Sequence, residues 1–430
     1  MIRRCRRSAA SARAALLVLA LLAGFAAGPA AAGSALAASP EPTLVLRECF
    51  ADWHTGTCQE LSHPSLELAE GVAVSPDGRS VYVAASHREG PDLGSNAITE
   101  FSRDTEGKLR PTGCLTFAGG RHCRAARIPL EGVRRLVVTQ DGRDVYALAD
   151  DGIAEFARAA SGRLRPIGCL AFDTEGPGTS RCKHPEGGLE TDMSGLAVSP
   201  DGADLYVTAG NYVIRRAGDR SVSQMLEFSR RPDGTLAAIG CFGVTHSSRC
   251  LDIGAGELRE PVVAGDGRAL YVVDDESLFR FTRWSEGSLG RPECLLGRSA
   301  RCAQTRGAPA PSYMSVALSA DGSRLYLGTT KSTIAYSVES DGYLTKLASQ
   351  PVPSYTLALS PDGSLLFGTD SEGVNAFLIA EDGLSRSGAT YADEGAEGLA
   401  VTPDGSTLLV ASWWASDLLA LTSNTKEPVP

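Results

Sequence analysis

One short motif returns seven times along this chain and limits what the chain can fold into. Each copy has alternating apolar and polar residues, then Asp-Gly, then alternation again. The copies read "GVAVSPDGRSVYV", "RLVVTQDGRDVYA", "GLAVSPDGADLYV", "PVVAGDGRALYV", "SVALSADGSRLYL", "TLALSPDGSLLFG" and "GLAVTPDGSTLLV". Period two on both sides of such a turn predicts a β-hairpin. Five positions after each turn aspartate stands a large apolar residue, aromatic in six copies: Tyr82, Tyr146, Tyr206, Tyr271, Tyr326, Phe367 and Leu409.

A second hairpin follows the first in most copies, as in "AITEFSRDTEGKLRPTG", "EFARAASGRLRPIG" and "EFSRRPDGTLAAIG". Each unit therefore has four predicted antiparallel strands, a to d. Seven such units predict an all-β fold, a seven-bladed β-propeller of four-stranded blades. A two-sheet sandwich would not require seven equivalent units.

The seventh unit ends without a strand d, and the start of the repeat region offers one. The segment "LVLRECFADWHTGTC" aligns with "LRPTGCLTFAGGRHC", cysteine on cysteine. We therefore expect residues 43–50 to pair beside residues 417–422 and close the ring. Such closure covers a strand edge that would otherwise stay open.

The first 38 residues have the pattern of a secretory signal peptide. Four arginines within the first seven residues precede the apolar stretch "ALLVLALLAGFAAG" and several small-residue cleavage sites. We expect residues 1–38 to be removed and residues 39–430 to form a secreted, monomeric propeller; an uncleaved membrane anchor is the alternative. No later segment is long and apolar enough to span a bilayer. Removal leaves 36 basic and 51 acidic side chains, a balance that argues against nucleic-acid binding.

The ten cysteines after residue 38 form five local pairs, each in a connection between two blades. In an exported chain, an even number of cysteines at such spacings predicts disulfides, which would staple loops on one face of the propeller. Zinc sites prefer closer cysteine spacings than these. The predicted pairs are Cys49 with Cys58, Cys114 with Cys123, Cys169 with Cys182, Cys241 with Cys250, and Cys294 with Cys302.

The repeats resemble those of the seven-bladed propeller lactonase family with YVTN-type repeats. "DLYVTAGN" is a near match to the repeat core, and units such as "SPDGRSVYVA" are typical of it. Enzymes similar to this family include bacterial propeller-type 6-phosphogluconolactonases and muconate-lactonising enzymes of fungi, and other members have no assigned reaction. The resemblance implies the fold strongly and hydrolysis of a small lactone weakly, because one fold hosts many reactions.

Seven equivalent positions are expected to ring the mouth of the central channel. They lie seven residues before each turn aspartate, where the innermost strands begin. Two carboxylates close together could activate water, and arginines could bind a substrate carboxylate or stabilise an oxyanion. The alternative is that these charges pair with one another and fill the mouth. The ring consists of Glu70, Arg134, Ser194, Arg259, Met314, Tyr355 and Glu397, of which Glu70, Arg134, Arg259 and Glu397 are the catalytic candidates and Ser194 and Tyr355 the substrate-binding ones.

A metal is expected to be absent, although calcium is the alternative. "AEGVAVSPDG" and "AEGLAVTPDG" are similar to the start of metal-dependent gluconolactonases, which implies Glu70 or Glu397 as a ligand, but the ring lacks the further Asn and Asp ligands of those enzymes. Acids in the b–c loops offer oxygen ligands that calcium accepts. These acids are Asp150, Asp151, Asp274, Asp275, Glu276 and Asp370.

Two further groups are candidates for the same face. Trp413 and Trp414, in the last b–c loop, could stack on a sugar or another ring-shaped ligand. The six histidines fall in predicted loops, where one could act as a general base: His54, His63, His87, His122, His184 and His246.

The sequence therefore favours a secreted lactonase-like hydrolase of small cyclic esters. The alternative is a non-catalytic extracellular propeller that binds carbohydrate or protein ligands. Motifs of serine hydrolases, zinc proteases and P-loop nucleotide-binding proteins are absent from the sequence.

Overall fold

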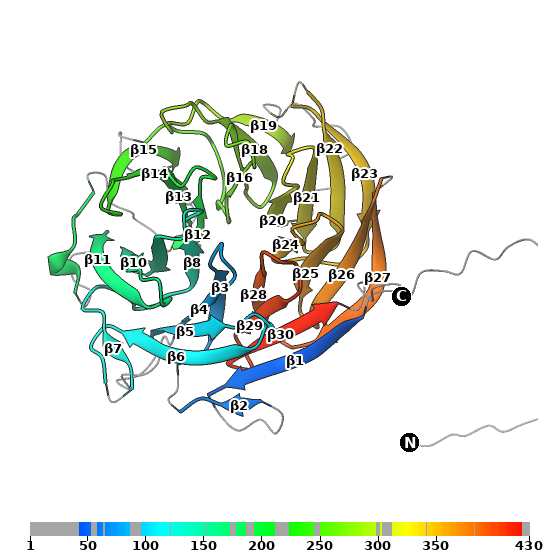
Figure 1. Cartoon of the computed structure of the whole chain (residues 1–430). Helices are drawn as coiled ribbons and strands as arrows, with labels where there is room; N and C mark the ends of the chain where they lie inside the picture. The colour runs from blue at the N-terminus through cyan, green and yellow to red at the C-terminus, as the bar shows by residue number, and fades with distance from the viewer. Residues whose placement is uncertain are drawn as a thin grey trace, which may run out of the picture. The chain divides into compact units, whose positions relative to one another are not determined.

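Seven β-sheets stand around a central channel, as the repeats predict (Figure 1). The computed structural model describes residues 43–423 except 53–57, 63–64, 87–95, 121, 151, 173–177, 186–192, 211–222, 245–249, 298–301, 303–311, 341 and 382. The predicted signal peptide, Asp151, His54, His63, His87 and His246 lie outside the described residues. Residues 40–430 belong to one unit of the chain. No helix among the described residues is long and apolar enough to cross a membrane.

Each blade has four antiparallel strands, with strand a nearest the channel. Blade 1 has β3 (Ala69–Val74), β4 (Ser80–Ala85), β5 (Ala97–Arg103) and β6 (Leu109–Thr116); blade 2 has β8 (Arg135–Val138), β9 (Asp144–Ala149), β10 (Gly152–Arg158) and β11 (Leu164–Ala171); blade 3 has β12 (Met193–Val198), β13 (Asp204–Gly210), β14 (Ser223–Arg230) and β15 (Leu236–Val244).

The next three blades repeat this order. Blade 4 has β16 (Val262–Val263), β17 (Ala269–Val273), β18 (Ser277–Thr282) and β19 (Glu293–Gly297); blade 5 has β20 (Tyr313–Leu318), β21 (Arg324–Thr329), β22 (Thr333–Val338) and β23 (Leu344–Gln350); blade 6 has β24 (Leu357–Leu359), β25 (Leu365–Asp370), β26 (Gly373–Ala380) and β27 (Gly383–Ala392). A short 3-10 helix, η1 (Thr179–Arg181), lies between blades 2 and 3.

Blade 7 takes strands from both ends of the described chain. It contains β28 (Ala396–Val401), β29 (Leu408–Ser412) and β30 (Asp417–Ser423), and β1 (Leu44–Ala51) pairs antiparallel with β30 in the same sheet (Figure 1). Leu44 lies opposite Ser423 and Ala51 opposite Asp417. The fourth strand of this blade is therefore N-terminal, at the residues where the sequence predicts it.

The conserved geometry of the first turn explains the repeated Asp-Gly. In blade 1 the Gly78 N–H donates to the Ser75 carbonyl at 2.8 Å, and an Asp77 carboxylate oxygen accepts the Arg79 N–H at 3.1 Å. The turn glycine needs a positive φ, which glycine adopts without steric cost. All seven equivalent glycines have φ between 67° and 71°: Gly78, Gly142, Gly202, Gly267, Gly322, Gly363 and Gly405.

The core lies between neighbouring blades, and the repeated aromatic residue is its centre. All seven residues five positions after the turn aspartate are at most 3% exposed. Two of the tyrosines also link blades through their hydroxyls: Tyr146 donates to the Gly234 carbonyl at 2.8 Å and Tyr206 to that of Gly287 at 3.0 Å, each in the c–d turn of the following blade. The polar end of each of these two rings is thus satisfied although the ring is buried.

Arginines at the end of strand c tie each of several blades to the preceding one. Arg283 of blade 4 binds Asp201 at 2.8 Å, buried Asp204, and the Tyr206 hydroxyl at 2.9 Å, all in blade 3. Arg158 of blade 2 binds Asp77 at 2.8 Å and has Ser80 where Arg283 has Asp204. The other two pairs of this kind are Arg230 with Asp141 and Asp144, and Arg103 with Asp404.

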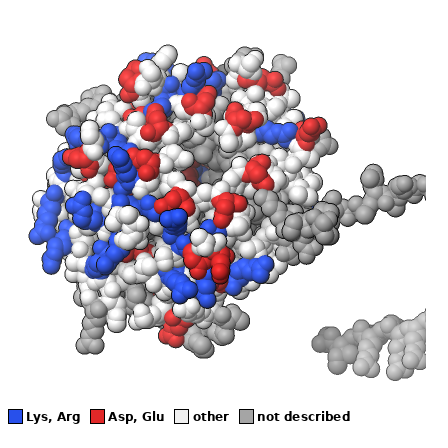
Figure 2. Space-filling view, in the orientation of Figure 1, with Lys and Arg blue, Asp and Glu red and all other residues white. Residues whose placement is uncertain are grey.

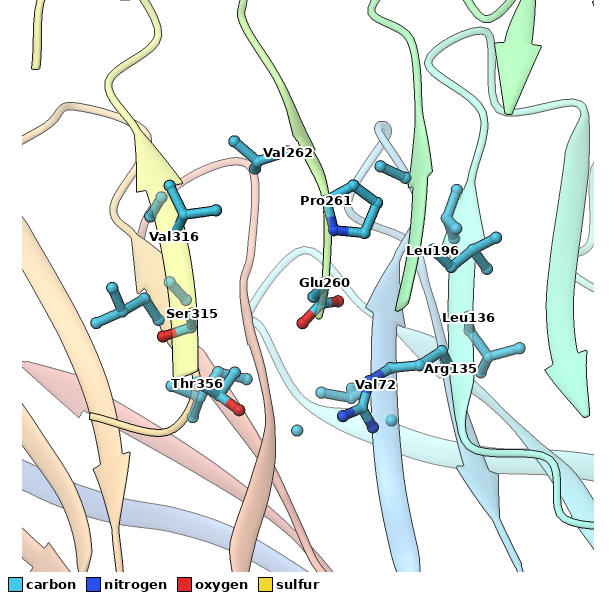
Figure 3. A pocket seen from close by; sticks show the side chains of 18 of the residues that line it. Val72, Arg135, Leu136, Leu196, Glu260, Pro261, Val262, Ser315, Val316 and Thr356 are labelled. Carbon is cyan, nitrogen blue, oxygen red and sulfur yellow. The ribbon is translucent and has the colours of Figure 1, made fainter. Parts of the chain in front are cut away.

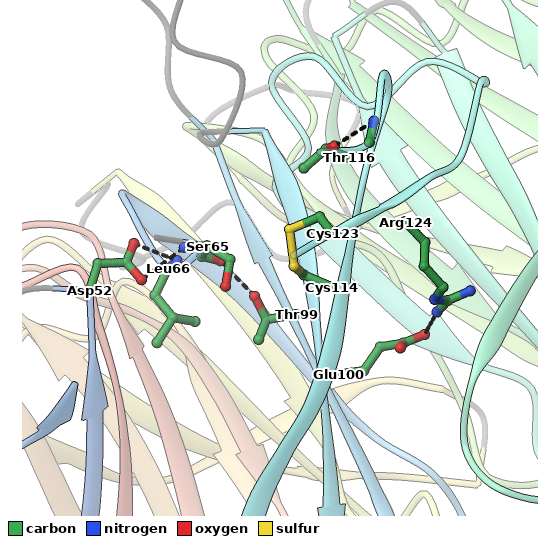
Figure 4. The surroundings of a disulfide bond; sticks show 10 residues. Asp52, Ser65, Leu66, Thr99, Glu100, Cys114, Thr116, Cys123 and Arg124 are labelled. Atoms are coloured by element: carbon green, nitrogen blue, oxygen red, sulfur yellow. Dashed lines mark hydrogen bonds and ion pairs between the residues drawn. A yellow bond between two sulfur atoms is a disulfide. The ribbon is translucent and has the colours of Figure 1, made fainter. Parts of the chain in front are cut away.

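All five predicted cysteine pairs are disulfides. In blades 1 and 7 the chain returns parallel to strand d after the second cysteine as a short fifth strand, which the sequence patterns do not predict. In blade 1 this strand is β7 (Arg124–Ala125) beside β6, and in blade 7 it is β2 (Gln59–Glu60) beside β1. Arg124 also binds buried Glu100, so the loop beyond Cys114–Cys123 is fixed by a sheet and an ion pair (Figure 4).

Candidate functional site

The seven predicted ring residues line one cavity at the mouth of the central channel. The cavity has a volume of about 440 Å³, within the usual range for small-molecule sites. A hollow lies at the centre of the molecular face shown in Figure 2, with acidic and basic side chains around it. The convergence that the repeat spacing predicts is therefore present. The lining includes Glu70, Arg134, Ser194, Arg259, Met314, Tyr355 and Glu397.

β-Bulges aim four of these side chains into the mouth. The register between strands a and b shifts by one residue at Glu70, Ser194, Met314 and Glu397. A bulge adds one residue to a strand and re-aims its side chain. Because of these bulges, two successive positions of the innermost strands can face the channel, where strict alternation would allow only one.

Both ring arginines are bound by acids of the b–c loops. The Arg134 guanidinium forms an ion pair with Asp150, and its Nε donates to the Gly132 carbonyl at 3.2 Å. Arg259 Nη2 binds an Asp275 carboxylate oxygen at 2.7 Å. These contacts hold each guanidinium at the cavity wall, and they also neutralise part of its charge. Both ring arginines therefore pair with loop acids outside the ring, whereas the alternative interpretation of the sequence expected the ring charges to pair with one another.

The two ring glutamates lie on adjacent innermost strands. A Cβ atom added to Gly398 would stand 2.8 Å from the Glu70 carbonyl oxygen, which shows how closely β28 approaches β3. The Ser86 hydroxyl donates to Glu70 Oε1 at 3.0 Å and so orients that carboxylate. Glu397 is exposed at the cavity rim.

The uncharged ring positions differ in how free they are to meet a ligand. The Ser194 hydroxyl donates to the Leu258 carbonyl at 2.8 Å, which holds it between blades 3 and 4. Tyr355 is 38% exposed, so its ring presents an accessible apolar surface at the mouth.

Two charged residues that sequence reasoning missed lie one position beyond the ring. Arg135 and Glu260 line both the mouth cavity and a second cavity of about 440 Å³ that continues into the channel. Figure 3 shows the Arg135 guanidinium and the Glu260 carboxylate pointing into this space. The available signal was the repeat itself, since both residues directly follow ring arginines.

Glycines occupy three of the seven equivalent channel positions and allow the strands to approach one another. A Cβ on Gly71 would lie 2.4 Å from the Arg134 carbonyl oxygen, and one on Gly195 would lie 2.5 Å from the Glu260 Cα. Real Cβ atoms do not make such contacts, so a side chain at either position would push blade 2 or blade 4 away. The glycines thus set where Arg134, Arg135 and Glu260 stand.

The remaining predicted site residues lie away from the mouth cavity. Trp413 and Trp414 pack edge to face with ring centres 4.8 Å apart, in the turn between β29 and β30, and neither lines the mouth or the channel. Trp414 is 72% exposed. His122 and His184 are exposed and also do not line the cavity.

The b–c loop acids that the structure describes are engaged with protein groups. Asp370 accepts the Glu372 N–H at 2.8 Å, and buried Asp274 accepts the Gly256 N–H at 2.6 Å. Burial raises the pKa of Asp274, although its backbone hydrogen bonds act in the opposite direction. Asp150 and Asp275 bind the ring arginines. Within the described ranges, these oxygens do not form the shared cluster that calcium requires.

One group of ligand-type atoms does lie close together in the described part of the chain. Cys49 and Cys58 Sγ and an Asp417 oxygen lie within 4.8 Å of one another. The two sulfurs form a disulfide, whereas a metal ligand is a thiolate. This group therefore does not fit a metal ion.

Comparison with known proteins places the fold and leaves the reaction open. No protein-family model matches the sequence, and no curated protein matches it. A protein proposed to be a 6-phosphogluconolactonase from Bacteroides fragilis is 17% identical, with a TM-score of 0.55 over 83% of this chain and 97% of that one. The periplasmic gluconolactonase of Pseudomonas aeruginosa is 16% identical, with a TM-score of 0.52 over 78% and 88%.

A protein of different chemistry is equally similar in structure. Hydrazine synthase of Kuenenia stuttgartiensis is 13% identical and gives a TM-score of 0.54 over 87% of this chain and 100% of that one. Structural similarity at such low sequence identity therefore supports the architecture and not a particular reaction. The chain has the seven-bladed β-propeller fold that 6-phosphogluconolactonase-like structures share.

Proposed function

We propose that the protein hydrolyses a small lactone at the channel mouth, outside the cytoplasm. The observation that carries the proposal is the convergence of two glutamates and two arginines on one cavity. The lactonase names of two structural neighbours agree with it. Five disulfides and the predicted signal peptide support the location, because disulfides persist in oxidising compartments.

The chemistry requires a base that activates the attacking water and a hydrogen-bond donor that stabilises the oxyanion formed from the carbonyl oxygen. Glu70, which Ser86 orients, would take a proton from water as the water attacks the lactone carbonyl carbon. The N–H groups of Arg134 or Arg259 that are not bound to acids would stabilise the oxyanion. Collapse of the tetrahedral intermediate breaks the ring C–O bond, and the alkoxide takes the proton to give a hydroxy acid.

A binding role without catalysis is the second candidate. The pairing of both ring arginines with Asp150 and Asp275 favours it, because a paired guanidinium is a weaker electrophile. The exposed ring of Tyr355 would then contact a carbohydrate or protein ligand.

Proton release from a panel of sugar and aliphatic lactones, followed in a pH-stat, tests the proposal. The protein would be oxidised residues 39–430, compared with Glu70→Gln, Glu397→Gln and the Arg134→Gln/Arg259→Gln double variant. Arg143→Gln is the matched control, because Arg143 is exposed in a turn and does not line the cavity. We expect turnover by wild type and control and its loss in the ring variants.

Three other outcomes would each overturn a different part of the proposal. Equal turnover by wild type and all ring variants would remove these residues from the reaction. Turnover lost on addition of chelator would place a metal ion in it. Absence of turnover together with saturable binding of a glycan would favour the second candidate.

A further inference from the structure

The channel below the mouth contains two charged side chains that meet no counter-ion among the described residues. Arg135 Nη1 donates to the backbone carbonyls of Arg134, at 3.1 Å, and Glu70, at 3.2 Å, and the guanidinium meets no carboxylate among the described residues. The Glu260 carboxylate has no hydrogen bond or ion pair within that same part of the chain. The two side chains do not pair with each other. The ring arginines directly above are different, because each has an aspartate.

The surroundings make these unpaired charges costly unless a ligand meets them. Apolar side chains form much of the channel wall, including Val72, Val262 and Val316, and both charged residues are partly buried (Figure 3). A charge in such surroundings is favourable when a hydrogen-bonding partner of opposite sign replaces water. An apolar cavity with a few inward-facing polar groups is typical of a small-molecule site.

The donor and acceptor pattern defines the class of ligand. The Arg135 guanidinium only donates, and its Nη1 is already held by two carbonyls, so its remaining N–H groups are oriented for a carboxylate. The Glu260 carboxylate only accepts, so it suits a hydroxyl. Thr356, whose hydroxyl also points into the channel, adds a neutral group that can donate or accept (Figure 3).

We propose that the channel binds a hydroxy acid, with Arg135 on its carboxylate and Glu260 on a hydroxyl. This proposal rests on the proposed function in one respect, since a hydroxy acid is what hydrolysis of a lactone releases. Glu70, Arg135, Glu260, Thr356 and Glu397 line both cavities, so a molecule opened at the mouth has a continuous path to the channel. The released hydroxy acid is then expected to inhibit competitively.

Titration calorimetry on oxidised residues 39–430 tests the site without any lactone. Gluconate is the hydroxy-acid probe, sorbitol lacks its carboxylate, hexanoate lacks its hydroxyls, and 6-aminohexanoate carries an ammonium group in place of the hydroxyls. We expect gluconate to bind wild-type protein at least about tenfold more tightly than any of the other three, because it alone satisfies both charges.

Two variants test the residues, and Arg143→Gln is again the control. Arg135→Gln is expected to weaken gluconate at least about tenfold and leave it no tighter than sorbitol. Glu260→Gln is expected to reduce the preference for gluconate over hexanoate. The comparison of probes on wild-type protein remains decisive if either variant fails to fold.

Several results would overturn the proposal. The first three are equal affinity for sorbitol and gluconate, unchanged gluconate affinity in Arg135→Gln, and tighter binding of 6-aminohexanoate than of gluconate. The fourth is that gluconate does not bind at about 10 mM, which means a binding free energy weaker than about 3 kcal/mol. Lactone turnover without gluconate binding would refute this site and leave the hydrolase standing. Gluconate binding without turnover would do the reverse.

Discussion

The arginine at the end of strand c in blade 4 provides a sharp test of how the blades hold together. Arg283 has a side chain only 5% exposed and binds Asp204, whose side chain is 3% exposed. Replacing Arg283 by methionine keeps much of the apolar stem and removes the charge. The Asp204 carboxylate then stays buried without a cation. Breaking a buried ion pair in this way costs about 3–5 kcal/mol of unfolding free energy.

Blade 2 supplies the matched control. Arg158 makes the equivalent contacts with Asp77, at 2.8 Å, and the Tyr82 hydroxyl, at 3.2 Å, but its third partner is the Ser80 hydroxyl. Asp77 is 45% exposed and can return to water. Arg158→Met should therefore cost only about 1–2 kcal/mol, from buried hydroxyls that lose one hydrogen bond.

Urea unfolding of the oxidised protein measures both variants, and pH separates the cause. Burial already raises the pKa of Asp204, and Arg283 acts to lower it. An acid with a raised folded-state pKa is destabilising above its unfolded pKa of about 3.9, and the penalty shrinks as pH falls. The cost of Arg283→Met should thus be smaller at pH 5 than at pH 8. The double variant Arg283→Met/Asp204→Ser should recover most of it.

Equal costs for Arg283→Met and Arg158→Met, or a cost that does not change between pH 5 and pH 8, would refute this reasoning. The stabilisation would then come from packing of the arginine stem, which both positions share. A failure of Asp204→Ser to recover stability would lead to the same conclusion.

Three further predictions follow from features of the fold. Burial raises the pKa of Asp417 to about 7 and that of Asp393 to about 6, so the stability of the wild-type protein should fall between pH 5 and pH 9. Asp417→Asn should therefore raise the thermal midpoint more at pH 9 than at pH 5, and an effect that does not change with pH would contradict this explanation. Replacing Cys114 and Cys123 together by serine should cost roughly 2.5–3 kcal/mol in urea unfolding, because the disulfide closes a loop with a sequence separation of 9; an unchanged midpoint would show that the β7 pairing alone holds the loop. Gly71→Ala should abolish gluconate binding in the channel, which Gly71 lines, because its Cβ would stand 2.4 Å from the Arg134 carbonyl oxygen; wild-type affinity for gluconate in calorimetry would refute it.

The sequence predicted the fold well because the determinants of a blade are local. Alternation around Asp-Gly fixes two strands and their turn, and the aromatic residue after it marks the core. Alignment of the cysteines predicted the partner of β30 at the opposite end of the chain. Counting seven residues back from each turn aspartate identified seven residues that do line one cavity.

The interior of the channel escaped prediction for a physical reason. Strict alternation places Arg134 and Arg135 on opposite faces of a strand, whereas both line the cavity. Bulges at equivalent positions of other blades break that alternation. The pairing of Arg134 and Arg259 with loop aspartates likewise arises only when the loops fold over the channel mouth.

The order of the cysteines has a consequence for how the molecule can be made. Each disulfide joins a cysteine to the next one in the sequence, with separations of 8 to 13 residues. A chain that is oxidised as it emerges from its amino end meets the native partner of each cysteine before any other. The correct covalent pattern is then also the first one within reach, so the five stapled loops can close in turn without reshuffling.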